Sequence, residues 1–186
     1  MPAPAVSAPK KTIFRAFRRD ERGSAAVEFS LVALTFFALL FAIIETALVF
    51  FAGQVLESGI QDSGRLIYTN QMTNTDTTAQ EFLDDLCPRV QTLLNCQNLD
   101  IDVKYYPPGS TITLTEPITN GSYDKSGMAF NIPPPNSTGT VVVRGYYQWP
   151  LIVTGLGYNI ANIGRGTANN KRLLVGLSAF HVEPPP

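Results

Sequence analysis

The chain is poor in the residues that build most catalytic and metal sites. Its 186 residues include one histidine, one tryptophan and two cysteines. The histidine, His181, lies near the end of a predicted strand and gives no basis for a Ser-His-Asp set. Two thiols with one distant imidazole also lack the spacing of a metal site. We therefore predict no metal, no cofactor and no enzymatic activity.

Positive charge is scarce outside the N-terminal region. The first 23 residues hold six of the 14 basic residues and two of the 15 acidic ones, so the rest carries eight bases and 13 acids, a net charge of −5. An acidic body argues against nucleic-acid binding, which needs a basic face. A basic leader before an apolar segment predicts a cytoplasmic N-terminus and an exported body.

One long apolar run, Ser24–Ala52, is the feature around which the chain is organised. Glu28 and Glu45 are the only charged residues within it. About 20 residues suffice to cross the hydrocarbon of a bilayer, so the run is long enough for a transmembrane helix. A removable secretory signal has its apolar core before the cleavage site. Here the basic leader comes first, so the apolar run is expected to stay on the mature protein.

An acid within such a run needs a partner, because a charged side chain in hydrocarbon costs about 2.5–3.5 kcal/mol or more. Cleavage after Gly23 would create an amine on Ser24, one helical turn before Glu28. The alternatives are an uncleaved signal anchor, in which Gly23 has no special role, and a Glu28 that snorkels to the inner headgroups. Glu45 has two interpretations as well: a place at the outer membrane interface, or a contact with a neighbouring subunit.

The sequence around the first acid resembles a known processing site. Gly23, with Glu28 at the fifth position after it and Phe29 next, resembles the cleavage site of type IV prepilins. Residues 18–67 are similar to the TadE-type pseudopilins of the Tad (tight adherence) pilus system. Further similar stretches are Ile43–Ile44–Glu45, Ile60–Leu66 and, more weakly, Tyr147–Pro150 and Phe180–Pro184.

This resemblance implies a minor pseudopilin that a prepilin peptidase cuts after Gly23, leaving Ser24 as the first residue. Glu28 and Phe29 would be assembly contacts with other pilins and pseudopilins at an inner-membrane assembly platform. Glu28 would pair with the Ser24 amine of its own or a neighbouring chain. The resemblance also implies a bacterial inner-membrane protein with a periplasmic C-terminal domain, extracellular once in the pilus.

The exported domain is far larger than the short helix that the resemblance implies for a major pilin, which favours a tip or initiation role over bulk fibre. The alternative function is an uncleaved, single-pass, membrane-anchored binding or adhesion module. A third reading, an anchored periplasmic enzyme, is opposed by the missing catalytic constellation.

Periodicity beyond the apolar run predicts an α+β fold. Apolar residues recur at three and four positions from Val55 to Ile67 and extend the helix to about Tyr68. Thr78–Glu81 fits a capping box that opens a second helix. Antiparallel strands packed on these helices are expected. The expected elements are strands at Leu99–Tyr106, Gly139–Trp149 and Arg172–Val182, a short strand at Thr111–Thr115, a turn at Asn120–Gly121 and a helical turn over Leu156–Ile163.

The sequence thus predicts four regions: a basic leader (1–23), a transmembrane helix (24–52), its amphipathic extension (53–70) and an exported α+β domain (71–186). In an oxidising compartment Cys87 and Cys96 predict a disulfide. Nine helical residues would separate their Cα atoms by about 13.5 Å, whereas a disulfide needs less than about 7 Å. Either Pro88 ends the second helix and the chain doubles back, or the thiols stay free. We favour the disulfide and a helix over Ala79–Leu86.

Overall fold

The computed structural model describes residues 23–69, 71–72, 78–154 and 158–184. The chain divides into two compact units, Met1–Phe41 and Ala42–Pro186, which are described separately. The predicted leader up to residue 22 and most of a polar stretch after the first helix, residues 73–77, lie outside the described residues.

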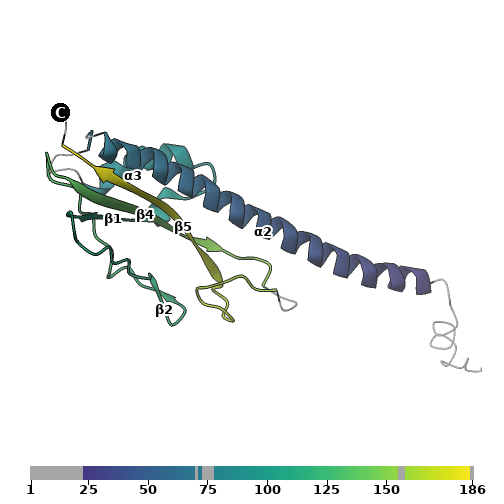
Figure 1. Cartoon of the computed structure of the whole chain (residues 1–186). Helices are drawn as coiled ribbons and strands as arrows, with labels where there is room; N and C mark the ends of the chain where they lie inside the picture. Colours follow the sequence, from purple (N-terminus) through teal and green to yellow (C-terminus); the bar gives the residue numbers. More distant parts are fainter. Residues whose placement is uncertain (1–22, 70, 73–77, 155–157, 185–186) are drawn as a thin grey trace, which may run out of the picture. The chain divides into compact units, whose positions relative to one another are not determined.

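Helix α2 runs from Ser24 to Tyr68, the bounds that the sequence predicts (Figure 1). In the first unit its large apolar side chains are exposed, as Val27, Phe29 and Leu34 show. In the second unit one side of α2 is buried, and this burial begins at Glu45. The residues of the buried side are Glu45, Val49, Ala52, Leu56, Gly59, Ile60, Ser63, Gly64 and Ile67. Helix α2 is therefore apolar and exposed in the first unit, whereas one of its sides is part of the core in the second unit.

The second unit contains a three-stranded antiparallel sheet in the order β1-β4-β5. Together with α2 and a second helix, this sheet confirms the predicted α+β fold. A separate small hairpin is formed by β2 and β3, and its turn residues Asn120 and Gly121 have positive φ angles of 53° and 73°, as the predicted Asn-Gly turn requires. The strands are β1 (Leu99–Tyr106), β2 (Ile118–Thr119), β3 (Ser122–Tyr123), β4 (Gly139–Pro150) and β5 (Lys171–Val182).

The main core lies between the sheet and the two helices, α2 and α3 (Ala79–Val90). Val103 of β1 and Val143 of β4 are direct cross-strand partners and are fully buried. Ile60 of α2 and Phe82 of α3 belong to the same cluster. A smaller cluster, built on Tyr146, Ile163 and Leu173, covers another part of the domain.

Two glycines bring α2 close to the sheet. Gly145 of β4 and Gly176 of β5 are cross-strand partners. A Cβ added at Gly176 would lie 3.0 Å from the Leu56 carbonyl oxygen and 3.1 Å from the Glu57 Cα. A Cβ at Gly145 would lie 2.5 Å from the Ile60 Cδ1. The missing side chains at this pair therefore set the distance between the helix and the sheet.

Helix α3 opens with the predicted capping box. The Glu81 N–H donates to the Thr78 hydroxyl, and the Thr78 N–H donates to the Glu81 carboxylate. The prediction that Pro88 ends this helix near Leu86 is wrong, because α3 continues to Val90. Proline removes one backbone donor, and the last turn is kept by burial of Val90 in the core.

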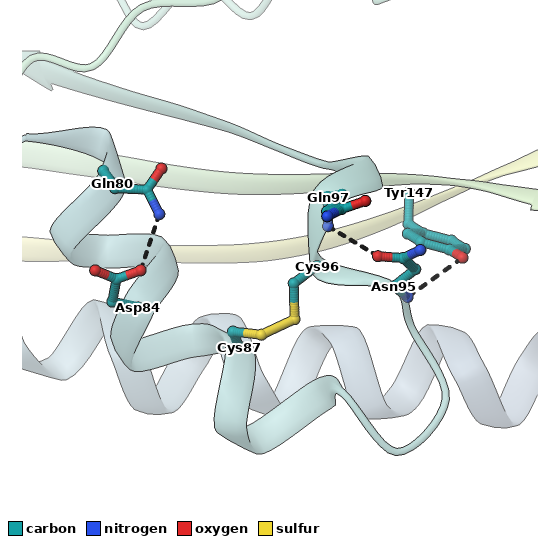
Figure 2. The surroundings of a disulfide bond; sticks show 7 residues. All are labelled: Gln80, Asp84, Cys87, Asn95, Cys96, Gln97 and Tyr147. Carbon is teal, nitrogen blue, oxygen red and sulfur yellow. Dashed lines mark hydrogen bonds between the residues drawn. A yellow bond between two sulfur atoms is a disulfide. The ribbon is translucent and has the colours of Figure 1, made fainter.

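The chain reverses after α3, and Cys87 and Cys96 form a disulfide (Figure 2). Their Cα atoms are 5.7 Å apart. Helix and disulfide coexist because α3 ends before Cys96, which starts a 3₁₀ turn, η2 (Cys96–Asn98). The Asn95 side chain caps this turn by accepting from the Gln97 N–H. The turn then leads directly into β1.

Two of the smaller predicted elements differ from the structure. Thr111–Thr115 is not a strand; its carbonyls accept from side chains of the sheet, Thr113 from the Tyr106 hydroxyl and Thr115 from Arg144. The helical turn predicted over Leu156–Ile163 falls partly outside the described residues, and residues 158–163 contain no helix. Side-chain hydrogen bonds to two carbonyls, rather than a strand ladder, thus link the first segment to the sheet.

Candidate functional site

The start of α2 brings together the residues of the predicted processing site. Gly23 is exposed and directly precedes the helix. The Ser24 hydroxyl donates to the Glu28 carboxylate across one helical turn, with an Oγ–Oε1 distance of 3.1 Å. Phe29 is 74% exposed. The geometry therefore places an atom of residue 24 within hydrogen-bond reach of the first acid.

Exposed apolar side chains continue along α2 from Val27 to Phe51. Among the described residues, α2 is the one helix long and apolar enough to cross a membrane. At about 1.5 Å per residue, the stretch from Val27 to Phe51 spans about 36 Å, which exceeds the roughly 30 Å of bilayer hydrocarbon. The helix is therefore compatible with a membrane anchor.

The second acid of the apolar run, Glu45, has a partner within its own chain. Its carboxylate is buried and accepts from two consecutive backbone N–H groups, those of Ile152 and Val153 in the loop after β4. Both carboxylate oxygens lie 3.1 Å from the Val153 nitrogen. The next helix residue, Thr46, shares a hydrogen bond with the Tyr158 hydroxyl. Two neighbouring helix residues thus bind the segment that follows β4.

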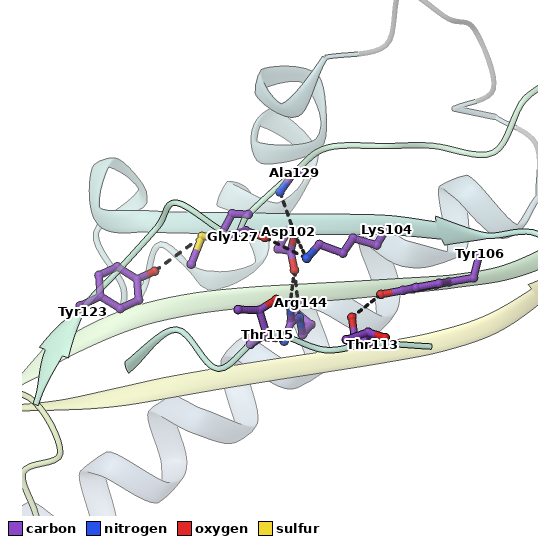
Figure 3. A network of polar contacts seen from close by, with 10 residues as sticks. Asp102, Lys104, Tyr106, Thr113, Thr115, Tyr123, Gly127, Ala129 and Arg144 are labelled. Atoms are coloured by element: carbon purple, nitrogen blue, oxygen red, sulfur yellow. Dashed lines mark hydrogen bonds and ion pairs between the residues drawn. The ribbon is translucent and has the colours of Figure 1, made fainter. Parts of the chain in front are cut away.

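A buried ion pair lies on the sheet face opposite the main core (Figure 3). Asp102 of β1 and Arg144 of β4 are direct cross-strand partners, with side chains 1% and 8% exposed. Arg144 donates to the Asp102 Oδ2 through two nitrogens and to the Thr115 carbonyl through a third. The other Asp102 oxygen accepts from the Ala129 N–H. The pair therefore holds the chain at Thr115 and at Ala129 against the sheet.

The surroundings of this pair do not suit acid–base catalysis. A hollow of about 90 Å³ beside Arg144 is lined in part by Thr115 and Tyr146. Burial raises the pKa of Tyr146 to about 12, although Arg144 acts in the opposite direction. Burial and the hydrogen bond to Asp100 also raise the pKa of Tyr123. Both phenols are therefore protonated near neutral pH, and the guanidinium is already held by its carboxylate.

Other predicted residues lie apart from one another. His181 is exposed on β5. Cys87 and Cys96 are bonded to each other in the disulfide, so neither offers a free thiol. Within the described ranges, no group of three His, Cys, Asp or Glu side chains has a geometry that would hold a metal ion. The site that remains is the apolar length of α2 with its two acids.

The comparison with known proteins finds a match in this same part of the chain. Residues 23–65 match the TadE-like protein family. The match confirms the resemblance over a TadE-like segment that begins at Gly23, includes Glu28 and Glu45, and ends near the C-terminal end of α2. The stretches Tyr147–Pro150 and Phe180–Pro184 lie outside it. No curated protein and no solved structure matches the chain.

The TadE-like segment indicates a protein associated with the Tad pilus. This family is structural and pilus-associated, not a family of enzymes, and it suggests interaction with other pilus components. The family match covers neither the sheet nor the disulfide. The part of the chain after residue 65 is therefore described by its own structure alone.

Sequence reasoning missed the partner of Glu45 and the burial of Asp102. The Glu45 carboxylate and the Ile152 nitrogen are separated by 107 residues, whereas the sequence predicted a place at the membrane interface or a contact with a neighbouring subunit. Asp102 alternates with apolar residues along β1, a pattern that predicts an exposed side chain. The nearest signal was the single charged residue of strand β4, Arg144 in its middle, because a buried arginine requires an acid.

Proposed function

We propose that this protein is a minor pseudopilin of a Tad-type pilus, acting in pilus assembly, initiation or tip formation. The observation that carries the proposal is the position of Gly23 and Glu28 at the start of an exposed apolar helix, within the TadE-like segment. A prepilin peptidase cuts after Gly23 from the cytoplasmic side. The mature helix then remains in the inner membrane until it is assembled.

In this proposal Glu28 sets the register of the helix among other pilins. The new terminal amine on Ser24 pairs with the Glu28 carboxylate of its own or a neighbouring chain. The 3.1 Å distance between the Ser24 Oγ and Glu28 Oε1 supports the pairing, because it shows that an atom of residue 24 reaches the acid. The pair offsets the cost of burying each charge in an apolar bundle. Phe29 supplies apolar contact beside it.

The exported domain of this pseudopilin favours a tip or initiation role. A sheet, a second helix and a disulfide follow the transmembrane part. A domain of this size is large for the repeating subunit of a thin fibre. The acidic domain is periplasmic before assembly and extracellular afterwards. The partners are the prepilin peptidase, other pilins and pseudopilins, and the inner-membrane assembly platform.

Loss of pili is the expected result when this gene is deleted from its host. Complementation with the wild-type chain restores pili, and complementation with Gly23→Leu does not, because the uncut leader keeps the helix from entering the assembly. Pilus counts by electron microscopy give the measurement. An uncleaved adhesion module predicts the opposite: normal pili in the deletion strain, with adhesion restored equally by wild type and Gly23→Leu.

A further inference from the structure

We propose that the start of the loop after β4, residues 151–154, is a second membrane contact of this protein, with Ile152 inserted into the outer leaflet beside α2. Ile152 is 90% exposed, more than any other large apolar side chain among the described residues. It stands next to the Glu45 carboxylate that binds its backbone. The inference rests on the proposed insertion of α2 in a membrane and goes beyond the pilus role.

We infer that lipid contacts Ile152, because exposed apolar side chains of α2 lie around it. At the level of Glu45, the sides of α2 that do not face the domain still expose Ile43, Ile44 and Leu48. Exposed phenylalanines continue at positions 50 and 51, about 9 Å further along the helix at 1.5 Å per residue. Lipid that covers those side chains also reaches the loop at Glu45. The contact is therefore with the same bilayer that α2 enters, not with a separate partner.

The Glu45 carboxylate provides hydrogen-bond acceptors for loop backbone that would otherwise be unsatisfied within the membrane. Irregular backbone is excluded from lipid unless its polar groups are satisfied by protein. Ile152 and Val153 present two consecutive N–H groups, and Glu45 accepts from both. The same two donors stabilise the buried carboxylate. Glu45 thus acts as a positioning residue that holds the loop, and the pairing explains why an acid stands in the apolar run.

Charge near the loop fits a membrane surface. Residues 149–182 contain Arg165, Lys171 and Arg172 and no acidic residue, although the body of the protein is acidic. Lys171 begins β5 opposite Pro150, directly before the loop. Arg165 and Arg172 are exposed. A lysine at the base of a loop that enters a membrane suits contact with lipid phosphates.

Tryptophan scanning in vesicles tests the inference. The full chain carries one tryptophan, Trp149, so Trp149→Phe provides a silent background. Ile152→Trp is made in this background and reconstituted in phosphatidylcholine–phosphatidylglycerol vesicles with acyl chains brominated near the headgroup end in one set and near the methyl end in another. We expect blue-shifted emission and quenching by the brominated chains. Leu34→Trp within the apolar run is the positive control, and the exposed Ile112→Trp of the domain is the negative control.

The pattern of quenching among the three tryptophan variants decides whether residue 152 enters the membrane. Quenching at Ile152→Trp and Leu34→Trp, without quenching at Ile112→Trp, supports the inference. Quenching at Leu34→Trp alone overturns it and leaves the membrane anchor intact. Absence of quenching at Leu34→Trp overturns the anchor itself, and with it the proposed function. Because residue 152 is almost fully exposed, the substitution disturbs no core packing.

The role of Glu45 has its own test in the same vesicles. Glu45→Ala removes the acceptor of two N–H groups, so the quenching of Ile152→Trp is expected to fall while that of Leu34→Trp stays unchanged. Glu57→Ala is the matched control, because Glu57 lies on the same helix and its carboxylate accepts from Gln61. Equal quenching of Ile152→Trp with and without Glu45 would show that the acid does not hold the loop in the membrane.

Discussion

Replacing Asp102 with alanine is expected to lower the free energy of unfolding by about 3–5 kcal/mol, because it leaves a buried arginine without its counter-ion. The Arg144 side chain is 8% exposed and its partner 1%, so bulk water solvates the unpaired guanidinium poorly. The Ala129 N–H also loses its acceptor. Urea unfolding of the full chain in detergent, followed by the fluorescence of the half-buried Trp149, measures the loss.

Two controls distinguish the effect of breaking the Asp102–Arg144 ion pair from the effect of removing any charged side chain. The double variant Asp102→Leu/Arg144→Met removes both charges, and its cost is expected to be much smaller than that of Asp102→Ala, because buried pairs are often replaced by apolar residues without loss. Lys125→Ala breaks a pair whose lysine is 60% exposed and should change stability by less than about 1 kcal/mol. An Asp102→Ala protein as stable as Lys125→Ala would contradict the structural role given to the pair.

Replacing Glu28 with alanine is expected to reduce incorporation with other pilus components more than a hundredfold. Cleavage should survive, because the peptidase mainly needs Gly23, and membrane insertion should not suffer, because a charge in hydrocarbon is removed. The Ser24 amine then enters an apolar bundle without a counter-ion, at a cost of about 3–5 kcal/mol. Co-purification of the cleaved protein with the other pilins measures the effect.

The controls for Glu28 come from the same helix. Ser24→Ala removes the hydroxyl that contacts Glu28 but keeps the terminal amine, so incorporation should remain near wild type. Glu57→Ala removes an acid from the second unit and should also be incorporated. If cleaved Glu28→Ala co-purifies at wild-type levels, Glu28 is not the register contact and instead reaches the inner headgroups.

Local patterns were sufficient to predict most of the secondary structure. The full length of α2 follows from an apolar run that continues as a stripe at helical spacing, and β1 from strict alternation over Leu99–Tyr106. The capping box at Thr78 marks the start of α3. Its end was placed too early because Pro88 was given more weight than the burial of Val90. Patterns within one element thus locate it well, but packing decides its last turn.

Contacts between distant segments could not be predicted in the same way. Asp102 and Arg144 meet because β1 and β4 pair in one register, and no local pattern states that register. The Gly145–Gly176 pair is visible in the sequence as two isolated glycines, yet its purpose appears only once α2 lies across it. Glu45 was recognised as an unusual acid, but its partner lies in a loop that only the fold brings near.

The intact mass of the protein purified from membranes of its host shows whether the leader is removed after Gly23. A cleaved pseudopilin predicts a mature chain that begins at Ser24, and it predicts that Gly23→Leu, expressed alongside, keeps the full leader. The two proteins should differ by the mass of the first 23 residues, apart from any modification of the new terminus. A wild-type protein that retains Arg22, or one cut beyond Ala52, would contradict the account.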